Sequence, residues 1–276
     1  MKCEHKIVIF DLDETLGYYT EFGMFWDSIK EYLKSIKSPL ILNQDFFNKT
    51  LDLYPEFNRP NIIKILNYLK HKKQTNMCHK IMIYTNNQGA NDWAKMIISY
   101  FESKINYKLF DQIICAFKIQ RKQIEKNRTT HLKTYTDLIK CTKIPPDAEI
   151  CFLDDVYYPG MNRNNVTYIN LKPYEYDIKF DVMISRFING KVVPHLLPTS
   201  CREVLNTSMS NYAYTYVTKS EKELKVDKIV SKKVLHHLHI FFNNHNGVTR
   251  RIKNKHKKKN KTIKKKNKTI KKKNTI

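Results

Sequence analysis

The feature that most constrains this chain is an apolar run, Ile-Val-Ile-Phe at residues 7–10, that ends directly in Asp11 and Asp13. Four large apolar residues are the length of a strand buried on both faces of a sheet. In an open α/β sheet, ligands bind beyond the carboxyl ends of the strands, so both carboxylates are predicted at the mouth of a crevice. An ordinary strand-to-turn exit explains this stretch equally well when it is taken alone.

Two later runs of the same kind favour the crevice. Residues 81–84 are apolar and end in Thr85 and Asn86, and residues 150–153 are apolar and end in Asp154 and Asp155. Lys133 lies between these runs, near the start of a helix expected over residues 133–140. An acid pair, a hydroxyl, a lysine and a second acid pair in this order are far rarer by chance than any one of them.

The motif Asp-Leu-Asp-Glu-Thr-Leu at residues 11–16 resembles the first motif of the haloacid dehalogenase (HAD) superfamily, with the Thr that is typical of its phosphatases. The closest resemblance is to the NIF-like, or polymerase C-terminal-domain, phosphatase branch. Arg59-Pro60 before a helix and Ile-Tyr-Thr-Asn at residues 83–86 also resemble that branch. The resemblance covers residues 5–172.

The resemblance implies different catalytic roles for the acidic residues. Asp11 would be the nucleophile that forms an aspartyl-phosphate, and Asp13 would be the general acid and base. Mg²⁺ would be held by Asp11, Asp154 and Asp155, together with the backbone carbonyl of Asp13, because hard oxygen ligands suit this cation.

The remaining motif residues would bind the phosphoryl group. The resemblance gives this role to the Thr85 hydroxyl, the Asn86 N–H and the Lys133 ammonium group. Lys118 and Lys122 also lie between the second and fourth motifs, and Lys133 is preferred for its place before the helix. The Asp154-Asp155 pair departs from the Asp-Asn common in the polymerase-directed branch, which bears on the substrate more than on the reaction.

Strand-like and helix-like segments alternate from residue 6 to residue 170, which predicts an α/β fold with a doubly wound, mostly parallel sheet. Further strands are expected at residues 110–117 and 166–169. Residues 17–58 are too long for a simple connection and contain two helical patterns. By resemblance they form a small helical cap over the site. The alternative is that they pack against the flank of the domain.

The chain divides into a catalytic domain at residues 1–172, an extension at 173–247 and a tail at 248–276. The extension is expected to be helical at 180–188 and 230–242 and strand-like at 212–217. Its histidines, His236, His237, His239 and His245, lack accompanying carboxylate or Cys ligands, so a helical surface is favoured over a metal site.

The net charge of +24 is concentrated in the tail. From Val248 onward there are 15 Lys or Arg and no acidic residue, which leaves +9 for residues 1–247. The tail repeats a Lys-rich heptad from residue 257, buries little apolar surface and is expected to be disordered. It could bind nucleic acid or another polyanion, or direct nuclear import. Repeat slippage in an AT-rich genome is the alternative.

Cysteine usage and the absence of long apolar segments bear on the compartment. The six cysteines form no C-x-x-C pair and several lie in apolar runs, which indicates free thiols in a reducing environment. No apolar segment reaches the roughly 18–20 residues of a transmembrane helix, and Asp11 comes too early for a signal peptide. An intracellular protein, cytoplasmic or nuclear, is expected.

The predicted function is a Mg²⁺-dependent phosphomonoester hydrolase that acts on phosphoprotein, at Ser or Thr, or on nucleic-acid ends. A polynucleotide 3′-phosphatase is an alternative that the basic tail favours. The second class of function is a catalytically silent HAD-like module that binds nucleic acid or another polyanion. The retained acid pairs argue against that module, because binding alone does not require them.

Overall fold

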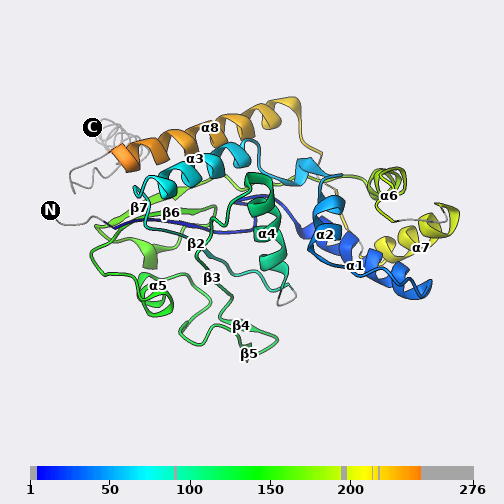
Figure 1. The fold of residues 1–276 in the computed structure, drawn as a ribbon, viewed down its shortest axis with the longest axis horizontal. Coiled ribbons are helices and arrows are strands. Elements are labelled where there is room, and N and C mark those ends of the chain that lie inside the picture. The colour runs from blue at the N-terminus through cyan, green and yellow to red at the C-terminus, as the bar shows by residue number, and fades with distance from the viewer. Residues whose placement is uncertain (1–4, 90–91, 194–197, 213, 217, 244–276) are drawn as a thin grey trace, which may run out of the picture. The chain divides into compact units, whose positions relative to one another are not determined.

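Five parallel strands form the central sheet of the protein, in the order β3-β2-β1-β6-β7. The computed structural model describes residues 5–89, 92–193, 198–212, 214–216 and 218–243, and the predicted tail and His245 lie outside them. The strands of the sheet are β1 (Lys6–Phe10), β2 (Lys80–Tyr84), β3 (Gln112–Ile114), β6 (Glu149–Asp154) and β7 (Val166–Asn170). This parallel sheet with helices on both faces confirms the α/β prediction and is Rossmann-like (Figure 1).

Alternate residues of each strand serve opposite faces of the sheet, and each face has its own core. On one face Val8, Phe10, Ile81 and Ile83 pack with apolar residues of helices that include α3 and α4. On the other face Ile7, Ile9, Met82 and others pack with α5. Burial on both faces explains why these strands are continuous apolar runs rather than alternating patterns.

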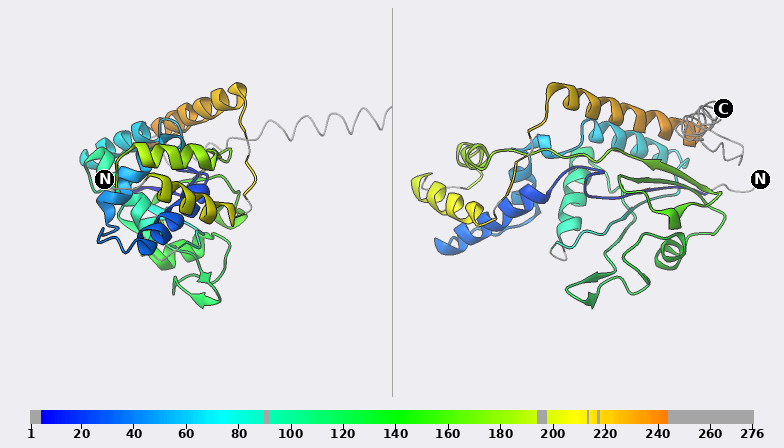
Figure 2. Two further views of the ribbon diagram at one scale, coloured as in Figure 1. Left: turned by 90° about the vertical axis from the view of Figure 1, so that its right-hand side faces the viewer. Right: turned by 180° about the vertical axis from the view of Figure 1, so that it is seen from behind.

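The helices connect the strands and extend beyond them. They are α1 (Thr20–Ser35), α2 (Gln44–Leu51), α3 (Ile62–Gln74), α4 (Trp93–Ile105), α5 (Tyr135–Thr142), α6 (Phe180–Asn189), α7 (Pro198–Ser210) and α8 (Glu221–Asn243), with 3₁₀ turns η1 (Pro55–Phe57) and η2 (Pro159–Met161). Figures 1 and 2 show α3 and α8 on one side of the sheet and α5 on the other.

The insertion after β1 and the extension after β7 form one helical group. Helices α1 and α2 come from residues 17–58, and α7 packs against both α1 and α6. Phe25 of α1 stacks edge-on with Phe187 of α6 at a ring-centroid distance of 5.6 Å. We call α1, α2, α6 and α7 the helical lobe. It lies at the end of the sheet away from the described N-terminus (Figure 2).

Several local predictions need correction. The strand expected at residues 110–117 is limited to Gln112–Ile114; beside it, the Asp111 carboxylate accepts a hydrogen bond from the Ile81 N–H at 2.8 Å. The polar connector after it contains a short hairpin, β4 (Lys118–Ile119) and β5 (Lys122–Gln123). Tyr212 and residues 214–216, expected to be a strand, lie in neither a helix nor a strand.

Candidate active site

Three neighbouring strands bring the predicted site residues to one edge of the sheet. Asp11 follows β1, Thr85 follows β2, and Asp154 is the last residue of β6. β1 lies between the other two in parallel register, with Phe10 opposite both Ile83 and Leu153. The three strands therefore end at the same level, and the chain crosses from one side of β1 to the other at this position, which is where open α/β sheets bind ligands.

The carboxylates of Asp11, Asp154 and Asp155 form a compact acidic group at this edge. One oxygen from each lies within 4.8 Å of the others. Asp11 and Asp154 are buried, with 8% and 0% of their surfaces exposed. Three carboxylates this close repel one another, and burial followed by the charge of Asp11 raises the pKa of Asp155. The group therefore favours a bound cation.

Lys133 supplies one positive charge to this acidic group. Its Nζ lies 2.6 Å from Asp11 Oδ1 and 2.7 Å from Asp154 Oδ2, and the side chain is 1% exposed. Burial alone would lower the pKa of Lys133, but Asp11 and Asp154 outweigh it and raise the pKa. The structure thus places Lys133 in the site, whereas Lys118 and Lys122 lie in the β4–β5 hairpin.

The start of α5 fixes the position of Lys133. Thr134 is the N-cap of α5, and its side chain accepts a hydrogen bond from the Asp137 N–H. The Thr134 N–H donates to the Tyr84 hydroxyl at 3.3 Å, and the Lys133 ammonium lies 5.3 Å from the centre of the Tyr158 ring. The cap and the two tyrosines hold the lysine at the edge of the sheet.

Asp13 lies apart from the acidic group and has a different environment. Its Oδ2 accepts a hydrogen bond from the Asn87 side-chain amide at 2.9 Å. Burial, followed by repulsion from Asp11, raises the pKa of Asp13 to about 6. An ordinary aspartate is almost fully ionised at neutral pH, whereas Asp13 retains a protonated fraction there. This carboxyl group is therefore suited to proton transfer.

Arg59 braces the loop that carries both aspartates. Glu14, between Asp13 and Thr15, has a φ of 56°. This left-handed conformation is energetically unfavourable for residues other than glycine. The buried Arg59 guanidinium donates to the Thr15 carbonyl at 2.6 Å, to the Glu14 carbonyl, and to the Lys172 carbonyl at 2.9 Å. The Thr15 hydroxyl in turn donates to Asp155 at 3.1 Å. These bonds keep the strained loop in place.

A second buried arginine, Arg128, holds the segment after β2. It donates to the Thr85 carbonyl at 3.0 Å and to Asn86 Oδ1 at 2.7 Å. The Asn86 amide then donates to the Tyr158 hydroxyl at 3.1 Å. The Thr85 hydroxyl, which was predicted to bind phosphate, is buried and accepts a hydrogen bond from the Asn87 N–H at 2.9 Å.

Sequence reasoning missed Asn87, Arg128 and Tyr158 as site residues. Asn87 was detectable, because it directly follows the Thr85-Asn86 pair that was selected. Arg128 carried no signal, since it lies in a polar connector with several other basic residues. Tyr158 lies four residues beyond Asp154 and has no motif of its own.

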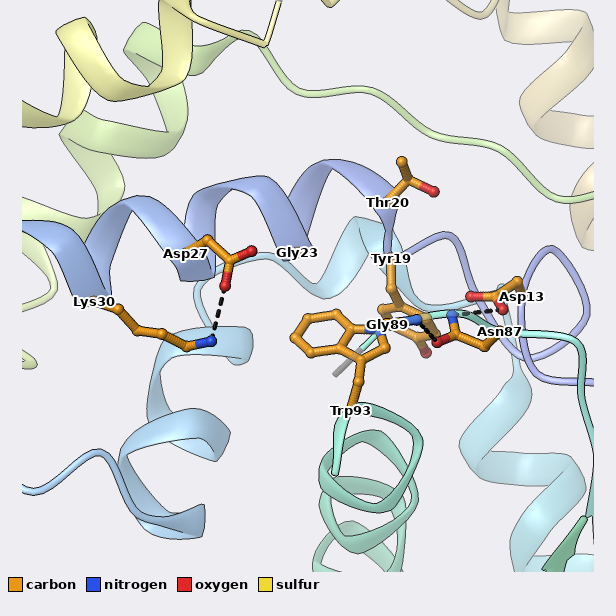
Figure 3. Close-up of a pocket in the computed structure, with 9 residues that line it drawn as sticks. All are labelled: Asp13, Tyr19, Thr20, Gly23, Asp27, Lys30, Asn87, Gly89 and Trp93. Atoms are coloured by element: carbon orange, nitrogen blue, oxygen red, sulfur yellow. Dashed lines mark hydrogen bonds and ion pairs between the residues drawn. The ribbon is translucent and has the colours of Figure 1, made fainter. Parts of the chain in front are cut away.

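Two adjoining cavities open at this edge of the sheet, each of about 240 Å³. The first, which we call the acidic cavity, is lined by Asp11, Asp13, Glu14, Asn86, Asn87, Lys133, Asp155, Val156 and Tyr158. The second, shown in Figure 3, is lined by Asp13, Tyr19, Thr20, Gly23, Asp27, Lys30, Asn87, Gly89 and Trp93. Asp13 and Asn87 belong to both cavities.

A divalent cation fits the acidic cavity. Three carboxylates and one ammonium group leave an excess of negative charge, and carboxylate oxygens are the ligands that hard cations prefer. Among the residues that the structure describes, these three aspartates are the one cluster of His, Cys, Asp or Glu side chains close enough together to hold a metal ion. His236, His237 and His239 lie on α8 outside it, and the five described cysteines are free thiols.

A scan against protein-family models found no match to this chain, and a search of curated proteins also found none. The fold and the site define an α/β protein with a Rossmann-like sheet and a buried acidic group beside a lysine. None of the described helices is both long and apolar enough to cross a membrane. The function is therefore argued from the geometry of the site.

Proposed function

We propose that this chain is a HAD-type phosphomonoester hydrolase that works with Mg²⁺ through an aspartyl-phosphate intermediate. The observation that carries the proposal is the Asp11–Lys133–Asp154 contact, with Asp155 alongside, at the carboxyl ends of β1 and β6. These are the residues that the motif resemblance selects, and Asp11 lies more than a hundred residues before the others in the chain. The acidic cavity beside them, of about 240 Å³, would take one phosphoryl group and one cation.

The proposed reaction assigns one step to each of two aspartates. The Asp11 carboxylate attacks phosphorus, and the bond between phosphorus and the leaving oxygen breaks while Asp13 donates its proton to that oxygen. Asp13 then accepts a proton from water as the water oxygen attacks the aspartyl-phosphate. This second attack breaks the phosphorus bond to Asp11 and releases inorganic phosphate. The pKa of about 6 suits Asp13 to both proton transfers.

The other residues of the site would bind the cation and the negatively charged phosphoryl oxygens. Asp11, Asp154 and Asp155 would hold Mg²⁺, which when bound lowers the repulsion between the substrate dianion and the carboxylates. Lys133 and Asn86 line the same cavity and would bind phosphoryl oxygens. Thr85 supports this segment through Asn87, and the helical lobe would act as the cap.

Hydrolysis of phenyl phosphate by the purified full chain in the presence of Mg²⁺ tests the proposal. Asp11→Asn should abolish turnover, because an amide is a far weaker nucleophile, and should prevent trapping of radiolabelled phosphate on acid-quenched protein. Asp147→Asn, which changes an exposed carboxylate outside the site, should retain full activity. Equal activity of the Asp11 and Asp147 variants would contradict the nucleophile assignment.

The physiological ester is a separate part of the proposal. Exposed Arg121, Lys122 and Lys126 on and beside the β4–β5 hairpin favour an anionic macromolecule, either a phosphoprotein or a nucleic-acid end. Faster turnover of a 3′-phosphorylated oligonucleotide than of a phosphoserine peptide would favour a polynucleotide phosphatase. Truncation before Val248 should weaken nucleic-acid binding and leave phenyl phosphate hydrolysis intact. Nucleic-acid binding with no hydrolysis would favour a silent module.

A further inference from the structure

The second cavity, which we call the Gly23 cavity, is joined to the acidic cavity through one hydrogen-bonded pair. Asp13 and Asn87 line both cavities, and the Asn87 amide donates to Asp13 Oδ2 at 2.9 Å. Figure 3 shows this pair at one end of the Gly23 cavity and the Asp27–Lys30 ion pair at the other, with the Trp93 indole between them.

The position of Asp13 determines what each cavity can hold. If Asp13 gives its proton to the leaving oxygen, as in the proposed function on which this inference rests, that oxygen must lie against Asp13. The phosphoryl group is then on the side of Asp11 and Lys133, and the rest of the leaving group extends to the other side. That other side is the Gly23 cavity.

The walls of the Gly23 cavity suit a flat apolar group. Trp93 begins α4 and is 8% exposed, and the buried Tyr19 lies at the start of α1. Gly23 lies within α1, where glycine is disfavoured relative to alanine. A Cβ at this position would meet Trp93 alone, at 3.5 Å, so the missing side chain leaves space above the indole. Aromatic rings pair favourably with such a surface.

The volume indicates how many rings fit. A protein cavity of about 150 Å³ is known to hold one benzene molecule. The Gly23 cavity, at about 240 Å³, therefore has room for one ring with a substituent. Its far end is the Asp27–Lys30 pair, whose side chains are 58% and 41% exposed. A chain attached to the ring can leave at that end.

We propose that the Gly23 cavity binds the phenol ring of an aryl phosphomonoester, with the ring against Trp93 and the phosphate in the acidic cavity. The ring comes either from a small aryl phosphate or from a phosphotyrosine side chain. Gly23 and Trp93 thereby determine specificity for the leaving group, while Asp13 lies between the two cavities.

The test compares kcat/KM for phenyl phosphate and ethyl phosphate in the wild type, Gly23→Leu and a matched control. The intrinsic reactivities of the two esters do not depend on the variant. A change in the ratio of their kcat/KM values therefore reflects a change in how the cavity binds the leaving group. Gly23→Leu should lower the phenyl value by roughly 10- to 200-fold, the range for a lost apolar contact in a pocket. The ethyl value should change less than twofold. Lys34→Leu, on the exposed part of α1, should change neither.

Gly23→Ala separates an effect on the cavity from an effect on folding. Alanine favours the helix, so this variant should unfold at a temperature no lower than the wild type. Its methyl group still narrows the space above Trp93, so the phenyl-to-ethyl ratio should fall. An equal loss for both esters in either glycine variant, or an unchanged ratio in Gly23→Leu, would overturn the proposal.

Binding of phosphonate analogues tests the preference for an aryl group independently of hydrolysis. Phenylphosphonate should bind the wild-type chain more tightly than ethylphosphonate by calorimetry, and Gly23→Leu should remove the difference. Equal binding by the wild type would overturn the aryl assignment, whereas absent turnover with this preference intact would overturn only the proposed function. Turnover of a phosphotyrosine peptide alongside phenyl phosphate supports a protein source for the ring, and turnover of phenyl phosphate alone supports a small ester.

Discussion

Replacement of Lys133 by methionine tests whether the buried charges act as one unit. Methionine keeps most of the side-chain volume but removes the ammonium group that lies 2.6 Å from Asp11 and 2.7 Å from Asp154. Asp154 is fully buried, so its carboxylate loses its cationic partner without gaining water. Breaking a buried ion pair by removing one partner costs about 3–5 kcal/mol, and we expect a loss of this size in the free energy of unfolding.

Urea unfolding followed by circular dichroism measures the loss. With a slope of about 2–3 kcal/mol per molar urea, the midpoint should fall by roughly 1–2.5 M. Lys104→Met is the matched control, because Lys104 forms a partly exposed pair with Asp52 that contributes less than about 1 kcal/mol. Mg²⁺ should reduce the effect of the Lys133 change, since a cation bound by the three aspartates opposes the same repulsion.

A double-mutant cycle separates the ion pair from general damage to the core. Lys133→Met with Asp154→Asn should cost less than the two single changes added together, by about 1 kcal/mol or more, because Asp11 is then the one charged partner left behind instead of two. Strict additivity, or a cost for Lys133→Met as small as that of the control, would refute the buried-network argument.

Three further changes test other parts of the fold. Burial raises the pKa of Glu21 to about 8, above its unfolded value near 4.5, so the folded state retains a proton between these values and wild-type stability should fall as the pH rises from about 5 to 8. Glu21→Gln should make that fall in urea-unfolding stability shallower without abolishing it, since Asp13 also has a raised pKa; a pH profile parallel to that of the wild type would contradict the assignment. Lys6→Met should cost about 1–3 kcal/mol, because Lys6 Nζ donates to the Phe241 carbonyl at 2.8 Å, and hydrogen exchange at the end of α8 should quicken with it. Arg59→Met should cost about 3 kcal/mol or more and lower kcat, since the guanidinium braces the loop after Asp11; unchanged kcat would show that the brace is dispensable.

The strands and the site were predictable from sequence for the same reason. The runs that became β1, β2 and β6 are buried on both faces, so their apolar character is continuous and their ends are marked by polar residues. Parallel neighbours end at one edge, which brought Asp11 and Asp154 into one hypothesis, whereas Lys133 was selected through the motif resemblance and its place before a helix.

The β4–β5 hairpin could not be predicted from sequence. Its strands are two residues long, so no alternation is visible. Gln120 and Arg121 at its turn have φ of 47° and 67°, in the region that Asn and Gly usually occupy in such turns, so the sequence gives no turn signal. Arg128 was missed for a related reason, because burial of one arginine among exposed basic residues depends on tertiary contacts.

Helix α7 was missed although its pattern was present. Its buried residues Cys201, Leu205 and Met209 recur every four positions, but the three residues between Leu205 and Met209 are Asn, Thr and Ser, which are weak helix formers. The helix gains its burial from α1, where the Ser28 hydroxyl contacts both Met209 and Ser208. Packing against a helix over 170 residues earlier in the chain cannot be inferred from a short stretch of sequence.

The bond between Lys6 and the last turn of α8 has a consequence for the order of folding. Lys6 opens the central strand, yet its acceptors, the carbonyls of Phe241 and Phe242, are synthesised about 235 residues later. On the ribosome the first strand emerges long before its capping helix, so the nascent chain must keep that strand paired by its neighbours alone. Contacts of such long sequence separation are slow to form, so we expect the bond between Lys6 and α8 to form after β1 has paired with β2 and β6, and after the acidic site at the other end of β1 has assembled.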